Sequence, residues 1–133
     1  MGKMTKSELR DIIDSIIPTR RDDDGDFVAI LQKDEDFSHN VAVYFVLNDD
    51  GDKFQMMTHT DLNVQDEERA LRFCNTWNTQ KSFGQAFFSN GVFRMNFTLN
   101  DPAEVPQEYL KSFISLNLAV AWQYYKEIGK AFE

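Results

Sequence analysis

The sequence predicts an α+β domain in which helices pack on one face of an antiparallel sheet, in the order α-β-β-β-α-β-β-α. Apolar residues recur at helical spacing in three places, and short runs rich in β-forming residues lie between them. An Asn-Gly pair between two apolar runs adds a tight hairpin. The 133 residues fit one domain, spanning 1–133, that is long enough to bury a core without disulfides or metals.

The first helix is expected to begin at a capping box, because Thr5 and Glu8 have the T-x-x-E spacing that satisfies first-turn amides. Its apolar residues follow at helical spacing, and Pro18 is expected to end it. Residues 20–26 are predicted to form a charged loop. The apolar positions of this helix are Leu9, Ile12, Ile13, Ile16 and Ile17.

Three strands are predicted next, over residues 27–33, 41–47 and 53–60. Residues 41–47 are apolar in both alternating sets, which is typical of a central strand with both faces at least partly covered. Residues 48–52 form a turn in which Gly51 is free to adopt a positive φ.

A second helix is predicted over residues 66–80, with an apolar stripe at i, i+3, i+4 and i+7 made by Ala70, Phe73, Cys74 and Trp77. The hairpin that follows turns at Asn90-Gly91, where both residues tolerate the positive φ of a type I′ turn. This turn pairs Phe88 with Phe93 and Ala86 with Met95. The predicted core face holds Gly84, Ala86, Phe88, Phe93, Met95 and Phe97, and the other face holds Phe83, Gln85, Phe87, Arg94, Asn96 and Thr98.

The last helix follows Pro106, a residue well suited to a first helical turn. It has more apolar circumference than one small sheet should cover. The predicted buried face comprises Leu110, Phe113, Ile114, Asn117, Val120, Ala121, Tyr124 and Ile128, and a second apolar set comprises Leu118, Trp122 and Tyr125.

Composition and motifs argue against several classes of function. A net charge of −8 and a pI near 4.7 disfavour nucleic acid as a partner, and no apolar run has the length of a membrane span. Cys74 falls on a buried stripe, and neither His39 nor His59 has a second ligand at metal-binding spacing. The glycines do not fit calcium or phosphate loops. We therefore predict a cytoplasmic protein with no catalytic residue, cofactor or metal.

The stretch from Arg69 to Asn78, with Asn75 and Asn78 spaced as N-x-x-N before a hairpin and a long final helix, resembles the signature of the YbjN family. That family is similar in fold to type III secretion chaperones, which are small, acidic, mostly homodimeric proteins that hold client segments. Its members are described as regulators of sensory transduction, a description that implies no known chemistry. The resemblance therefore implies a fold and leaves the partner open.

We hypothesise a non-enzymatic protein-binding domain, expected to be a homodimer, whose apolar surface holds a segment of another protein. The predicted partner or dimer surface is Leu118, Trp122 and Tyr125, with Phe83 and Phe87 on the hairpin as a second candidate. The alternative is that the first helix or a loop covers the helix set. A different hypothesis is a small-ligand-responsive regulator with Asn75 and Asn78 in the wall of a pocket between helix and sheet, although the two amides more plainly satisfy nearby backbone groups. An enzyme with a site assembled from distant residues ranks last.

Overall fold

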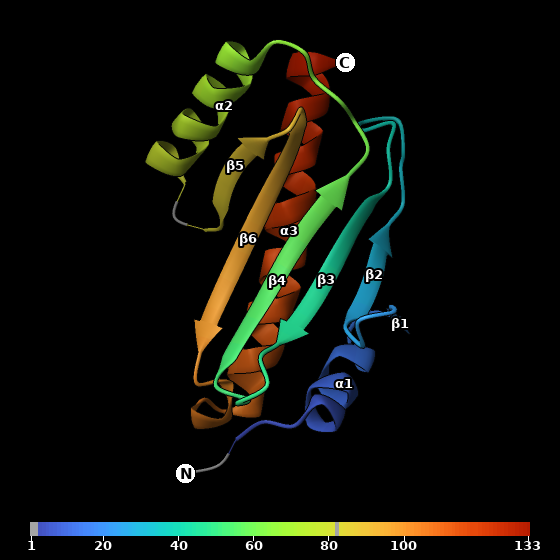
Figure 1. Cartoon of the computed structure of the whole chain (residues 1–133), viewed down its shortest axis with the longest axis vertical. Coiled ribbons are helices and arrows are strands. Elements are labelled where there is room, and N and C mark those ends of the chain that lie inside the picture. The colour runs from blue at the N-terminus through green and yellow to red at the C-terminus, as the bar shows by residue number, and fades with distance from the viewer. Residues whose placement is uncertain (1–2, 82) are drawn as a thin grey trace.

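The computed structural model describes residues 3–81 and 83–133, which form a six-stranded sheet with one long helix against it (Figure 1). This arrangement confirms the predicted α+β class. In chain order the elements are α1 (Lys6–Asp14), β1 (Arg20–Arg21), β2 (Phe27–Leu31), β3 (Val41–Leu47), β4 (Lys53–Thr60), α2 (Glu67–Gln80), β5 (Gln85–Ser89), β6 (Val92–Asn100), the short 3₁₀ helix η1 (Pro102–Glu104) and α3 (Gln107–Phe132).

All strand pairs of the sheet are antiparallel, in the order β1-β2-β3-β4-β6-β5. Strand β1 was not predicted, because its two residues are too few to show an alternating pattern. Arg20 and Arg21 pair with Val28 and Phe27, and a tight turn in which the Asp22 amide donates to the Asp26 carbonyl at 2.8 Å closes the hairpin. The predicted charged loop is therefore a hairpin that extends the sheet by one strand.

The boundary of α1 also differs from the prediction. The helix ends at Asp14, and Ser15 and Ile16 donate to carbonyls only three residues back, at 3.2 and 2.8 Å. This tighter final turn replaces the last helical turn expected before Pro18. The predicted capping box is present, with Thr5 and Glu8 each accepting from the other's backbone amide.

The second hairpin has the predicted register, with Phe88 opposite Phe93 and Ala86 opposite Met95. Asn90 and Gly91 both have positive φ, at 53° and 84°, as a type I′ turn requires. Because side chains alternate along a strand, this register fixes which residues of β5 and β6 face the core and which face away.

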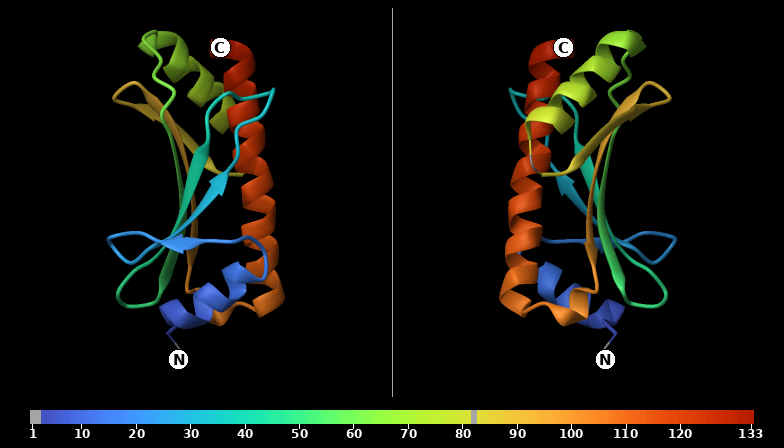
Figure 2. Two further views of the ribbon diagram at one scale, coloured as in Figure 1. Left: turned by 90° about the vertical axis from the view of Figure 1, so that its right-hand side faces the viewer. Right: turned by 90° about the vertical axis from the view of Figure 1, so that its left-hand side faces the viewer.

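The core lies between the sheet and α3, while α1 and α2 close its two ends (Figure 2). Every second residue of β3 faces this core and is buried, from Val41 to Leu47. The remaining residues of β3 face the opposite side, where α3 does not reach. Three hairpin turns curl away from α3, so this open face is concave (Figure 2). Over the described residues, the helices fall short of the length and apolarity that crossing a bilayer requires.

Candidate functional site

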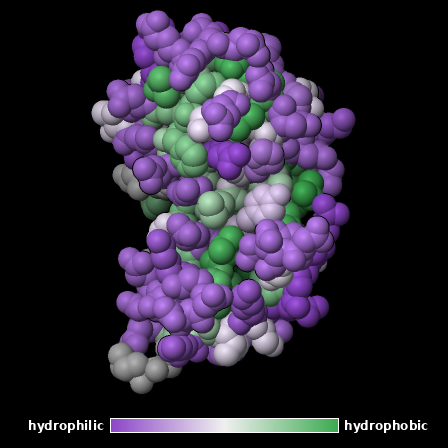
Figure 3. Space-filling view, in the orientation of Figure 1, coloured by the Kyte–Doolittle hydropathy of each residue, from purple (hydrophilic) through white to green (hydrophobic). Residues whose placement is uncertain are grey.

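The open face of the sheet carries a groove with a volume of about 430 Å³, which we call the open-face groove. Green and pale atoms cross the middle of this face in Figure 3, flanked by purple hydrophilic atoms. Its floor comes from β3 and β4, one side from the β1–β2 turn and the other from β5 and β6. The lining residues are Asp22, Asp24, Asp26, Tyr44, Val46, Met57, Thr58, His59, Phe87, Arg94 and Asn96.

Sheet register explains why most of these side chains share one face, whereas Thr58 points to the covered side. Val28, Tyr44, Met57 and Asn96 are successive partners across β2, β3, β4 and β6. Residues that are directly opposite in an antiparallel sheet point to the same side, so the four form one row. Tyr44 and Met57 are half-buried, which leaves part of an apolar floor open to a ligand.

One end of the groove is acidic. The carboxylate oxygens of Asp22, Asp24 and Asp26 lie within 4.8 Å of one another. The Asp22 carboxylate shapes the turn by accepting from the amides of Asp24 and Asp26 at 3.0 and 2.9 Å. Gly25 has a φ of +83°, a backbone conformation that suits glycine in this turn.

The carboxylates at the acidic end repel one another. Partial burial raises the pKa of Asp26, the neighbouring Asp22 charge raises it further, and Lys6 offsets part of the effect. Within the described parts of the chain, none of the three carboxylates has an ion-pair partner within 4.0 Å. Among the described residues, these three acidic side chains lie close enough together to hold a metal ion, although exposed acidic groups often lie this close without binding one.

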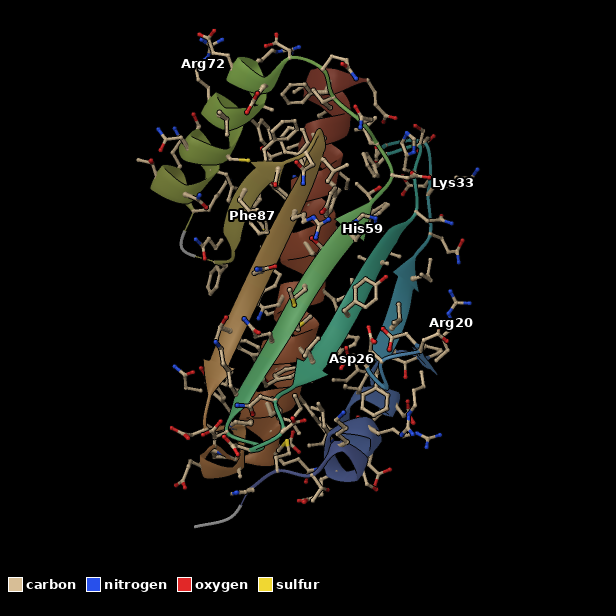
Figure 4. All side chains as sticks on the ribbon, viewed as in Figure 1. Arg20, Asp26, Lys33, His59, Arg72 and Phe87 are labelled. Atoms are coloured by element: carbon tan, nitrogen blue, oxygen red, sulfur yellow. The ribbon has the colours of Figure 1, made fainter. Side chains whose placement is uncertain are left out.

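The other end of the groove combines Arg94 with Phe87, which are cross-strand partners on β6 and β5. The Nε of Arg94 is buried and has no hydrogen-bond partner among residues 3–81 and 83–133. Nor do those ranges supply an ion-pair partner to its guanidinium. In Figure 4, Asp26 and Phe87 mark the two sides of this face, and His59 lies on the strand between them. The groove therefore has opposite charges at its two ends.

Beneath the groove, side-chain hydroxyls hydrogen-bond to the backbone of β6 beyond the point where the backbone pairing of β4 with β6 stops. The pairing of β4 with β6 runs from Lys53 and Asn100 to Met57 and Asn96. Beyond that point the Thr58 hydroxyl accepts from the Met95 amide at 2.8 Å and contacts the Tyr125 hydroxyl at 2.7 Å. Tyr125 also donates to the Phe93 carbonyl at 3.0 Å. These bonds fasten the groove floor to α3 from the covered side.

The residues predicted to form a partner surface on the last helix are partly or fully buried. Leu118 and Trp122 are half-buried against the core, and Tyr125 has 0% of its surface exposed. Tyr125 was therefore wrongly placed on a partner surface. The covering residue is Phe37 in the β2–β3 loop, whose ring centroid lies 5.5 Å from Tyr125 and 6.3 Å from Trp122. The sequence alone gives no sign that this polar loop turns an aromatic side chain inward.

The two asparagines of the N-x-x-N pattern differ in role. The Asn78 amide donates to the Ala86 carbonyl and accepts from the Ala86 amide, both at 2.8 Å. It thereby binds the outer strand β5 to α2. Asn75 is exposed, and its backbone carbonyl accepts from the Thr79 hydroxyl at 2.7 Å. Neither asparagine lines the open-face groove, so the structure supports a structural role for Asn78.

Cys74 is buried, as its position in the stripe predicts, and its Sγ lies 3.7 Å from the Tyr124 hydroxyl. Burial raises the pKa of the Cys74 thiol, which disfavours the thiolate that a nucleophile requires. His39 contacts Asp61 at 2.7 Å at the far end of the sheet, whereas His59 lines the groove. The two histidines are thus not brought together.

Of the two predicted phenylalanines, Phe87 lines the groove, whereas Phe83 is 49% exposed and lies outside it. Sequence reasoning missed the groove's acidic residues, Tyr44, Met57, His59 and Arg94. The alternation of each strand indicates which side these residues face. The strand order and the fold of the β1–β2 turn, which bring them together, are not visible in the sequence.

Comparison with known proteins agrees with the sequence resemblance. The model of the YbjN family, described as "putative bacterial sensory transduction regulator", matches residues 5–130. No curated protein and no solved structure gives a match to the chain. The family match covers nearly all of the chain, including every element that positions the groove. The chain therefore belongs to the YbjN family.

Proposed function

We propose that this protein is a non-enzymatic regulator that binds a segment of another protein in the open-face groove. The observation that carries the proposal is the contrast between the two faces of the sheet. One face is sealed by α3, and the other presents a concave, partly apolar floor, with charges at its ends that have no ion-pair partner among the described residues. Concave sites that combine apolar area with a few polar groups are typical binding sites. The family's regulatory description is compatible with this role.

A comparison of two matched variants tests the proposal. Phe87→Ser removes an aromatic side chain from the groove, and Leu71→Ser removes a 48% exposed side chain from α2, away from it. Proteins retained by each variant from a native extract are quantified by mass spectrometry, after circular dichroism has shown that both variants fold. We expect a partner that Leu71→Ser retains and Phe87→Ser loses. Equal retention by both variants would contradict the proposal.

A small-ligand-responsive regulator is a second candidate, because a volume of about 430 Å³ lies within the range of small-molecule sites. The groove lies on the open face, whereas the predicted pocket lay between helix and sheet. A ligand that binds only the folded protein raises its melting temperature. Screening a metabolite library by thermal shift with the wild type and Arg94→Gln tests this candidate, which requires a compound whose shift is lost in the variant.

We also propose a homodimer. Between Lys111 and Lys126, α3 has no charged residue, and its outward side includes Leu116, which is 46% exposed. Sedimentation equilibrium of the wild type and Leu116→Glu tests this proposal. We expect a dimer that the substitution weakens, whereas a monomeric wild type at high concentration would exclude the homodimer.

A further inference from the structure

We infer that the protein segment bound in the open-face groove carries a basic side chain that enters between Asp22, Asp24 and Asp26, and an acidic side chain that reaches Arg94. The inference rests on the proposed function and specifies the chemistry of the partner. It predicts a mixed-charge extended segment and disfavours both a purely acidic and a polybasic one.

The arrangement of the carboxylates at the acidic end is the evidence for a basic side chain in the partner. Three carboxylates converge within 4.8 Å without an ion-pair partner within 4.0 Å among the described residues. A guanidinium or ammonium group placed among them would relieve their repulsion and form charge-assisted hydrogen bonds. The two turn amides already use one oxygen of Asp22, whereas Asp24 is exposed and its carboxylate accepts no hydrogen bond from residues 3–81 or 83–133. Asp24 is therefore the carboxylate best placed to meet a new cation.

The floor of the groove suits the rest of such a segment. Tyr44, Val46 and Met57 are half-buried and line the space between the two charged ends. The long aliphatic stem of a lysine or arginine packs on apolar surface while its charged end stays hydrated. Apolar residues next to the basic one can cover the remainder of the floor.

Arg94 sets the requirement at the other end. From β2 to β6 the sheet spans three strand spacings, or roughly 14 Å. Asp26 and Arg94 also lie on opposite sides of the row that joins Val28 to Asn96, about four residues apart along the strands, which adds roughly 13 Å in that direction. The diagonal is therefore roughly 19 Å, and because an extended chain advances about 3.3 Å per residue, a segment along it would place the acidic residue about six positions from the basic one. A second basic residue at that position would be repelled by Arg94, which makes the groove selective against polybasic segments.

A displayed library of random nine-residue peptides, selected on the immobilised full chain, tests this inference. Enriched peptides are synthesised with a fluorophore, and their dissociation constants are measured by anisotropy. The matched variants are Asp24→Asn, inside the groove, and Asp23→Asn, an exposed neighbour outside it with the same change of charge. A second pair is Arg94→Gln and Arg72→Gln, the latter on the outer side of α2 (Figure 4).

The expected result is enrichment of peptides with a lysine or arginine and an acidic residue about six positions away. Asp24→Asn should weaken their binding about fivefold, as the loss of one exposed charge pair allows, and Asp23→Asn should change it less than about twofold. Arg94→Gln should weaken the binding of peptides that contain the acidic residue more than it weakens the binding of versions in which glutamine replaces that residue. Arg72→Gln should change the dissociation constants of both versions by the same factor.

Two results would overturn the inference. Enriched peptides without a basic residue, or equal losses in Asp24→Asn and Asp23→Asn, would show that charge at this end does not select the segment. If Phe87→Ser still weakened those peptides, the proposed function would stand without the inferred chemistry. Failure to enrich any peptide would count against both the inference and the proposed function.

Discussion

The two faces of the sheet differ in how their polar groups are satisfied. On the covered face, Thr58 and Tyr125 are buried, and their hydroxyls bond to each other and to the backbone of β6. On the open face, Asp26 and Arg94 are partly buried, and neither forms an ion pair within the described ranges. Buried polar groups are normally paired, so charges left unpaired in a groove indicate a surface suited to binding.

This difference predicts that equivalent substitutions have unequal effects on stability, and the largest difference concerns two phenylalanines, one in the second hairpin and one just before it. Phe93 is fully buried among other aromatic rings, whereas Phe83 is 49% exposed. Phe93→Ala should lower the free energy of unfolding by about 3–5 kcal/mol, and Phe83→Ala by less than about 0.5 kcal/mol. Urea denaturation followed by circular dichroism measures both. Similar losses would mean that the hairpin does not pack on the core as described.

The covered face should also determine how stability changes at alkaline pH. Burial raises the pKa of Tyr124 and Tyr125 above the ordinary value near 10. The unfolded chain therefore releases these protons at a lower pH than the folded chain does. Stability contributed by the neutral phenols is fully present below about pH 10 and is lost as pH rises, by about 1.4 kcal/mol per pH unit for each tyrosine.

Urea unfolding at several pH values above 10 measures this slope, and Tyr125→Phe supplies the control. The substitution should reduce the slope by the contribution of one tyrosine. An unchanged slope in Tyr125→Phe would show that its hydroxyl is not buried in the folded protein.

The two asparagines of α2 also differ in how their side chains are bonded. Asn78→Ala removes both hydrogen bonds to Ala86, whereas Asn75→Ala removes an exposed side chain that forms no hydrogen bond within the described part of the chain. The first should cost about 1–3 kcal/mol and the second less than about 0.5 kcal/mol. Hydrogen exchange of the Ala86 amide gives a second readout, since only Asn78→Ala should accelerate it. Faster exchange in Asn75→Ala would contradict this division of roles.

The smallest expected effect is a gain in stability, and it concerns a residue of the open face. Because burial and the Asp22 charge raise the pKa of Asp26, its ionised form is disfavoured in the folded state. The stability that its protonated form contributes at low pH is lost as pH rises through that folded pKa. Asp26→Asn should therefore raise the melting temperature slightly at pH 7, and more than Asp23→Asn does. A lower melting temperature in Asp26→Asn would show that the acidic end is held for stability, against a binding role.

The sequence allowed the fold to be predicted more fully than the site, for reasons that particular residues show. The Asn90-Gly91 turn determines the hairpin register through local backbone preferences, and Trp77 belongs to a stripe readable within one helix. The groove depends on strand order, which joins Tyr44, Met57 and Asn96 from three separate elements. The burial of Tyr125 depends on Phe37, which lies in a loop with no periodic pattern. Local patterns predict elements, whereas sites made by distant residues require the tertiary structure.

Photo-crosslinking from the two sides of the molecule would show which face binds the partner. A crosslinking phenylalanine derivative replaces His59, which is exposed in the groove, or Leu116, which is exposed on α3. We expect position 59 to capture another protein and excess wild-type chain to compete for it. Position 116 should capture only a second copy of this chain. Capture of the same partner from position 116, with none from position 59, would contradict the assignment of binding to the open face.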